Sequence, residues 1–114
     1  MYKFIISVVA ALLSVTALGA EDLPNCLTVG KEKQDEIVGK GYRPVSIRRG
    51  PVQAIIYATE LGQMKVFALV PKELSAQFQH DISQDSSVST EYSVCQMDGV
   101  QFLFVVITPV EQSV

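Results

Sequence analysis

The residue types of a catalytic triad are present in this chain, but their spacing points away from catalysis. His80 is the single histidine and Asp81 follows it, so a base and an orienting carboxylate stand together, with many serines as candidate nucleophiles. The G-x-S-x-G motif that places a nucleophilic serine on a sharp turn is absent from the sequence. A lone histidine on a surface helix is usually an ordinary solvated residue. We therefore expect His80 to have no catalytic role.

Carboxylate pairs are the second candidate chemistry. Asp35 adjoins Glu36, and Glu32 lies one helical turn before Glu36. These pairs fall on the expected solvent side of a helix, where they supply charge. The sequence also has no H-E-x-x-H, no phosphate-binding loop and no G-x-G-x-x-G. We predict that the protein is not an enzyme and that it carries no cofactor and no metal.

Two cysteines, Cys26 and Cys95, are the residues whose chemistry we expect to matter. In an exported chain an even number of cysteines is typical of a disulfide. A redox pair or a metal site is the alternative, but there is no C-x-x-C and only one histidine to complete a tetrahedral set. Closing a loop of about 70 residues would contribute on the order of 4 kcal/mol by chain entropy.

The N-terminus predicts export. Lys3 precedes an apolar run over residues 4–18, and small residues follow before a polar switch at Glu21. This pattern is typical of a signal peptide over residues 1–20, cleaved after Gly19 or Ala20. An uncleaved anchor is the alternative, but the run of about 15 residues is shorter than the roughly 20 that span a bilayer. We expect a periplasmic or secreted protein whose only membrane contact is the signal peptide before cleavage.

Charge limits the possible partners. The chain has 9 Lys and Arg against 12 Asp and Glu, a net charge of −3. General nucleic-acid binding needs a basic footprint, so we expect no nucleic-acid partner. A local basic stretch is interpreted as a solvated face; its members are Lys40, Arg43, Arg48 and Arg49.

The elements that must position these residues begin with a helix. Thr28 is a candidate N-cap for a helix over residues 29–38, which Gly39 or Gly41 would end. Pro44 then favours an extended segment over residues 45–48.

Strand signals dominate the rest of the chain. Residues 52–59 and 64–70 flank a short turn, and residues 91–97 and 100–108 flank Asp98-Gly99, a dipeptide that favours a two-residue hairpin turn. The strand over residues 100–108 is apolar on both faces, which predicts a central strand covered on both sides.

Leu74, Phe78 and Ile82 recur every four residues and predict a second short helix within residues 71–90. The polar run 83–87 predicts a mobile surface loop. The whole pattern predicts one domain over residues 21–114 with an α+β fold: a short N-terminal helix packed on a small antiparallel sheet of about four to five strands, with one disulfide.

The order of these motifs resembles that of small uncharacterised exported proteins of bacteria and their phages. The resemblance covers residues 26–104 and rests on Cys26, the short helix, residues 41–45 (GYRPV), the hairpins, and Cys95 with Gly99 four residues later. Those proteins often have a tryptophan in the first hairpin, which this chain lacks, and residues 72–90 look like an insertion relative to them. The resemblance implies a compact α+β fold and no particular activity.

Small size, an acidic surface and missing catalytic groups favour a non-enzymatic binding protein, such as an inhibitor, immunity or exclusion factor. The alternative is a periplasmic structural or assembly accessory that adds a strand to another envelope protein. In either class the expected partner is another protein of the envelope or extracellular space.

Overall fold

The computed structural model describes residues 22–110, so the predicted signal peptide lies outside the described residues. Two helices and five strands follow one another in this part of the chain. In order they are α2 (Cys26–Val38), β1 (Arg43–Arg48), β2 (Gln53–Ala58), β3 (Met64–Pro71), α3 (Lys72–Ser83), β4 (Val88–Met97) and β5 (Val100–Pro109).

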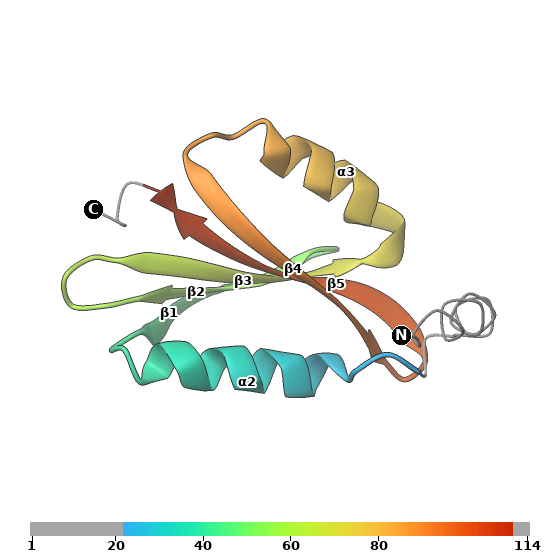
Figure 1. The fold of residues 1–114 in the computed structure, drawn as a ribbon, viewed down its shortest axis with the longest axis horizontal. Helices are drawn as coiled ribbons and strands as arrows, with labels where there is room; N and C mark the ends of the chain where they lie inside the picture. Colours follow the sequence, from blue (N-terminus) through green and yellow to red (C-terminus); the bar gives the residue numbers. More distant parts are fainter. Residues whose placement is uncertain (1–21, 111–114) are drawn as a thin grey trace, which may run out of the picture.

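The five strands form one antiparallel sheet with the order β1-β2-β3-β5-β4. Helix α2 lies along one face of this sheet and α3 along the other (Figure 1). The predicted α+β fold with one disulfide is therefore confirmed. Residues 22–25 precede α2, so the helix does not itself begin the chain.

Helix α2 starts three residues earlier than the sequence predicts, because Asn25 and not Thr28 caps it. The Asn25 side chain accepts a hydrogen bond from the Leu27 N–H at 2.8 Å, which satisfies one of the donors that a helix start leaves unpaired. The helix ends before Gly39, as predicted. Gly41 then takes φ +97°, a conformation that glycine adopts without strain.

Two strands start earlier than predicted. Strand β1 starts at Arg43 and includes Pro44, which an edge strand tolerates beside the irregularity between Pro44 and Ser46. Strand β4 starts at Val88, so residues 88–90 are strand and not loop. Polar side chains at Ser89 and Glu91 alternate with half-buried ones, and this alternation is what a strand with one solvated face requires.

The turn between β4 and β5 is the predicted two-residue hairpin. Asp98 has φ 53° and Gly99 has φ 80°, the positive values that such a turn needs at both central positions. The Gln96 side chain accepts a hydrogen bond from the Gly99 N–H at 3.0 Å and closes the turn.

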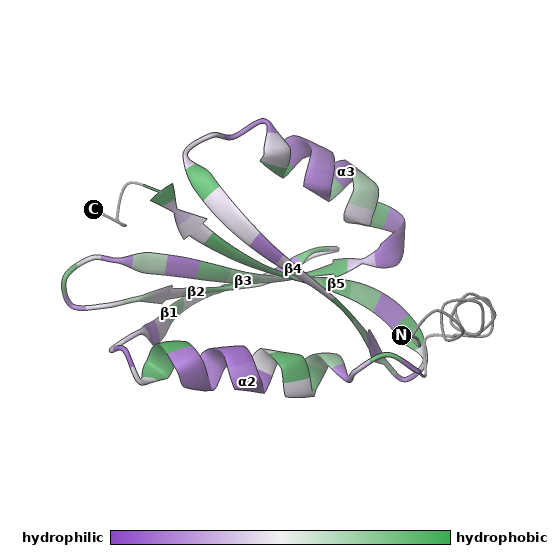
Figure 2. Cartoon of the chain, in the orientation of Figure 1, coloured by the Kyte–Doolittle hydropathy of each residue, from purple (hydrophilic) through white to green (hydrophobic). Residues whose placement is uncertain are grey.

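The core consists of two layers, one on each face of the sheet. Toward α2, Phe104 packs with Tyr57 and Phe67; the Phe67 and Phe104 ring centroids lie 5.3 Å apart, edge to face. Toward α3, Val70 and Val105 are fully buried. Strands β3 and β5 supply most of the apolar colouring of the sheet in Figure 2.

The prediction that β5 is the central strand needs a correction. Strand β5 is interior and pairs with both β3 and β4, but β3 occupies the middle of the sheet. The reason is that β3 is also apolar on both faces, and the tight hairpin puts β4 on the outer side of β5. The predicted covering of β5 on both sides is confirmed.

Helix α3 confirms the second predicted helix, but it covers the sheet only partly. It packs on β3 and β5. None of the α3 side chains is buried, and Leu74 is 39% exposed. The main apolar contact of α3 is made by Phe78, which packs against the core layer that contains Val70 and Val105.

Candidate functional site

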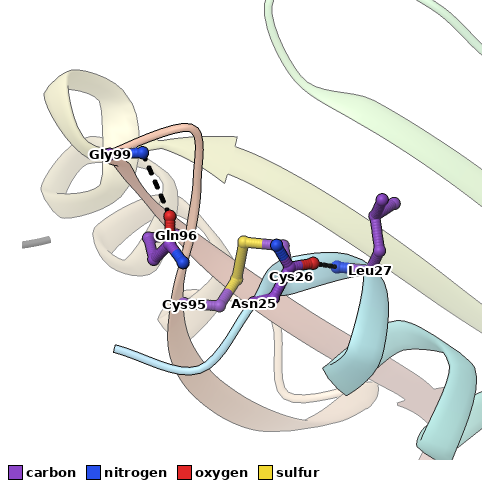
Figure 3. Close-up of a disulfide and its surroundings, with 6 residues drawn as sticks. All are labelled: Asn25, Cys26, Leu27, Cys95, Gln96 and Gly99. Carbon is purple, nitrogen blue, oxygen red and sulfur yellow. Dashed lines mark hydrogen bonds between the residues drawn. A yellow bond between two sulfur atoms is a disulfide. The ribbon is translucent and has the colours of Figure 1, made fainter. Parts of the chain in front are cut away.

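Cys26 and Cys95 form the predicted disulfide, which joins the start of α2 to β4 (Figure 3). The adjoining backbone strengthens this junction, because the Gln96 N–H donates to the Pro24 carbonyl at 2.9 Å. Asn25 and Gln96 make a short parallel bridge at the same place. The cross-link, the bridge and the helix cap together hold one end of α2 against the sheet.

The candidate triad residues do not assemble into a site. His80 and Asp81 are exposed on α3, and the Asp81 carboxylate accepts a hydrogen bond from the Gln77 amide at 2.8 Å. The His80 carbonyl accepts from the Ser83 hydroxyl, so that serine is occupied with its own helix end. Neither the spacing nor the burial of a catalytic group is present here.

The carboxylates of α2 are exposed, as expected. Asp35 pairs with Lys31 on the helix surface at 3.2 Å, and Lys33 reaches Glu91 of β4 at 3.3 Å. Within residues 22–110 no three His, Cys, Asp or Glu side chains are grouped so that they could hold a metal ion. No helix in the same range is long and apolar enough to cross a membrane.

A groove of about 770 Å³ opens between α2 and the sheet. Helix α2 packs on β4 and β5, and its two buried residues, Cys26 and Ile37, lie at its ends. A neighbouring stripe of the same helix faces the groove; its members are Leu27, Gly30, Gln34 and Val38. The floor consists mainly of apolar side chains from three strands: Ile55, Tyr57, Phe67, Leu69 and Phe104.

Gly30 helps to keep this groove open. A Cβ atom at this position would lie 3.7 Å from Cε1 of the Phe104 ring, so a larger side chain would extend over the floor. Leu27 and Ile47 border the groove and are 73% and 58% exposed. Large apolar side chains that face solvent across a concave surface are typical of a binding site.

The charge around the groove is opposite to that of the whole chain. Lys31, Arg48 and Arg49 line it together with one carboxylate, Asp35, which is paired with Lys31. The guanidinium groups of Arg48 and Arg49 make no ion pair or hydrogen bond with any other residue in the range 22–110. Two uncompensated guanidinium groups therefore stand at one rim, although the net charge of the chain is −3.

The two edges of the sheet differ in how well they are protected. Strand β1 carries Pro44, a register irregularity and two arginines, all of which discourage pairing with another strand. Among the described residues, strand β4 has only the short bridge at Gln96 on its outer side. Along an antiparallel strand, every second residue directs its backbone N–H and C=O groups toward the same side. The backbone groups of Val94, Tyr92 and Thr90 therefore point outward, as the Gln96 N–H does. No strand of residues 22–110 pairs with them.

Two side chains have perturbed acidity, and neither marks a reactive centre. Burial raises the pKa of Tyr57, whose side chain is 3% exposed beside Phe67. The Ser87 hydroxyl and backbone N–H both donate to Asp85, which lowers the pKa of that carboxyl. The role of Asp85 is therefore structural: its carboxylate stabilises the turn that leads from α3 into β4.

No protein-family model, curated protein or solved structure matches this chain. The geometry of the described residues is therefore the basis for any functional conclusion. The groove and the open β4 edge were both missed by sequence reasoning. The only sequence signal for the groove is a second helical stripe beside Cys26 and Ile37, and its Gly30 and Gln34 are not apolar enough to be recognised.

Proposed function

We propose that this chain is a small, exported, non-enzymatic binding protein that contacts another protein of the periplasm or extracellular space. The observation that carries the proposal is the open outer edge of β4. A strand edge with unpaired backbone groups can accept an extended segment of a partner, which supplies main-chain hydrogen bonds in regular order.

Side chains on β4 support this mode of binding. Tyr92 and Val94 are 39% and 43% exposed and lie two residues apart, so they share one face of the strand. An added strand would place its own side chains beside them, and cross-strand contacts of aromatic and β-branched residues stabilise such pairs. Glu91 points to the other face, where it pairs with Lys33.

Two classes of partner fit this edge. One is a toxin, lysozyme or protease that the chain would inhibit as an inhibitor, immunity or exclusion factor. The other is an envelope protein for which the chain would serve as a structural or assembly accessory, and the open edge favours this class because strand addition is its mode of contact. Loss of the partner's activity on binding would distinguish inhibition from assembly.

The test is affinity capture of the oxidised protein's partner from a periplasmic extract, with edge variants as probes. Tyr92→Pro removes an outward N–H and leaves the β5 ladder intact, because an edge strand tolerates proline where its N–H faces solvent. We expect this variant to keep a cooperative melt and to lose the captured protein.

Matched variants make the result specific. Val94→Lys on β4 should abolish capture, whereas Val45→Lys, the same change on the other edge strand, should leave it intact. Capture that survives Tyr92→Pro and Val94→Lys would refute the edge as the contact surface, and absence of any captured protein would refute the proposed partner class.

A further inference from the structure

The groove between α2 and the sheet lies on a different part of the molecule from the outer edge of β4. We propose that it binds a single-chain amphiphile, with the acyl chain on the apolar floor and a carboxylate headgroup at Arg48 and Arg49. This inference goes beyond the proposed protein partner and does not depend on it.

The backbone around the groove favours an acyl chain over a peptide. The floor strands β2 and β3 are each paired on both sides, so they have no free ladder hydrogen bonds. The backbone N–H and C=O groups of α2, which forms the other wall, are hydrogen-bonded within the helix. An extended peptide in the groove would find no main-chain partners and would lose its hydrogen bonds with water, which is costly. A hydrocarbon chain has no such requirement.

The size of the groove fits one small ligand. Sites for small molecules commonly enclose about 300–1,000 Å³ and combine an apolar lining with a few polar groups. The groove, at about 770 Å³, lies within that range. Its polar lining residues include Gln34 on the helical side and Gln53 on the sheet side.

The charge at the rim selects the headgroup. Arg48 and Arg49 follow one another at the end of β1 and have no anionic partner in residues 22–110. A guanidinium group presents two parallel N–H donors that match the two oxygens of a carboxylate. An anionic amphiphile would therefore place its charge where the protein has an uncompensated positive charge.

The experiment uses dodecanoate below its critical micelle concentration and the oxidised protein recovered after expression with its native leader. Titration calorimetry should give saturable 1:1 binding, and amide chemical-shift changes should be confined to α2, β2, β3 and the end of β1. Each methylene that enters the groove tightens binding by up to about fourfold, so decanoate should bind about 10-fold less tightly than dodecanoate.

Two pairs of variants test the two halves of the site. Arg48→Glu with Arg49→Glu should weaken dodecanoate binding about 10-fold or more, because it removes charge-assisted hydrogen bonds and adds repulsion. Lys40→Glu with Lys72→Glu changes the net charge by the same amount away from the groove and should leave binding unchanged. Gly30→Leu should block the groove, whereas Gly30→Ala should retain binding.

Headgroup controls complete the test. Dodecyltrimethylammonium and dodecyl maltoside carry a hydrocarbon chain one methylene longer than that of dodecanoate, and we nevertheless expect both to bind more weakly. Equal binding of all three, shift changes on another face, or no saturable binding would overturn the inference. A concentration-dependent dimer that Gly30→Leu abolishes would assign the groove to a second copy of the chain and would also overturn it. Capture of a protein by the β4 edge is unaffected by any of these outcomes.

Discussion

Cys26 and Cys95 are nearly removed from solvent, with exposed fractions of 5% and 0%, and they link a helix to a strand across 69 positions of sequence. Replacing both by serine should lower the free energy of unfolding by about 2–4 kcal/mol, a large share of the roughly 5–15 kcal/mol typical of a small domain. Urea denaturation of the double variant measures this loss.

The exposed substitution Ser89→Ala serves as the control for the cysteine variant and should change stability by less than about 0.5 kcal/mol. Reduction of the native protein should reproduce the loss seen in the double variant. Two reactive thiols in the purified, unreduced protein would contradict the assigned cross-link.

Tyr57 predicts a loss of stability at alkaline pH. Burial raises its pKa above the ordinary value of 10.0, so the unfolded chain releases this proton at a lower pH than the folded one. The contribution is complete below about pH 10 and falls as pH rises from there through the folded pKa. Chemical denaturation between pH 8 and pH 11.5 should show a steeper loss for the native protein than for Tyr57→Phe.

Tyr92→Phe is the matched control, because Tyr92 is 39% exposed on β4. Its pH profile should follow that of the native protein. Identical alkaline profiles for the native protein and Tyr57→Phe would contradict the effect of burial on the Tyr57 hydroxyl.

At the scale of elements, the two phenylalanines Phe104 and Phe78 test how differently the two faces of the sheet are packed. Phe104 is 6% exposed in β5 and contacts the Phe67 ring, so Phe104→Ala should cost about 3–5 kcal/mol and leave the protein largely unfolded. Phe78 is half-buried on α3, whose side chains are nowhere fully buried. Phe78→Ala should therefore cost less and leave a folded protein.

Circular dichroism and thermal melts separate these cases. A cooperative melt of Phe104→Ala near the native temperature would show that the α2 face does not depend on this ring. An equally large effect of Phe78→Ala would show that α3 is as tightly packed as α2.

The sequence predicts elements well where one local feature determines them. The Asp98-Gly99 turn is such a case, since its two positive φ angles restrict the choice of residues. The first three residues of β4 were missed because Ser89 and Thr90 are polar, and they belong to the strand only because they pair with β5. The central place of β3 depends on strand order, which no local pattern encodes.

The groove could not be predicted for a related reason. It exists because α2 packs on β4 and β5, while β1, β2 and β3 extend the sheet beyond the helix. The relative placement of helix and sheet is a tertiary property. From the sequence alone, the basic stretch that includes Arg48 and Arg49 is interpreted as a solvated face. The structure places these two residues beside the groove.

At the scale of the whole molecule, export is the prediction that governs the rest. The charged, apolar and small-residue pattern of residues 1–20 predicts cleavage after Gly19 or Ala20. Mass spectrometry of the protein expressed with its native leader should show an N-terminus at Ala20 or Glu21. An intact Met1 in the membrane fraction would contradict both the cleavage and the compartment in which the disulfide is expected to form.

The position of the disulfide also determines how the molecule would respond to mechanical force. When the chain is pulled from its two ends, tension passes from α2's first residue through the sulfur atoms into β4, so β1, β2, β3 and α3 are bypassed. Only about 20 described residues can then extend, which gives roughly 70 Å of released length at about 3.5 Å per residue. Reduction should add on the order of 240 Å in single-molecule pulling, as the bypassed residues join the stretched path. In the oxidised protein the tension therefore falls on β5, while β1, β2, β3 and α3 lie outside the path of the force.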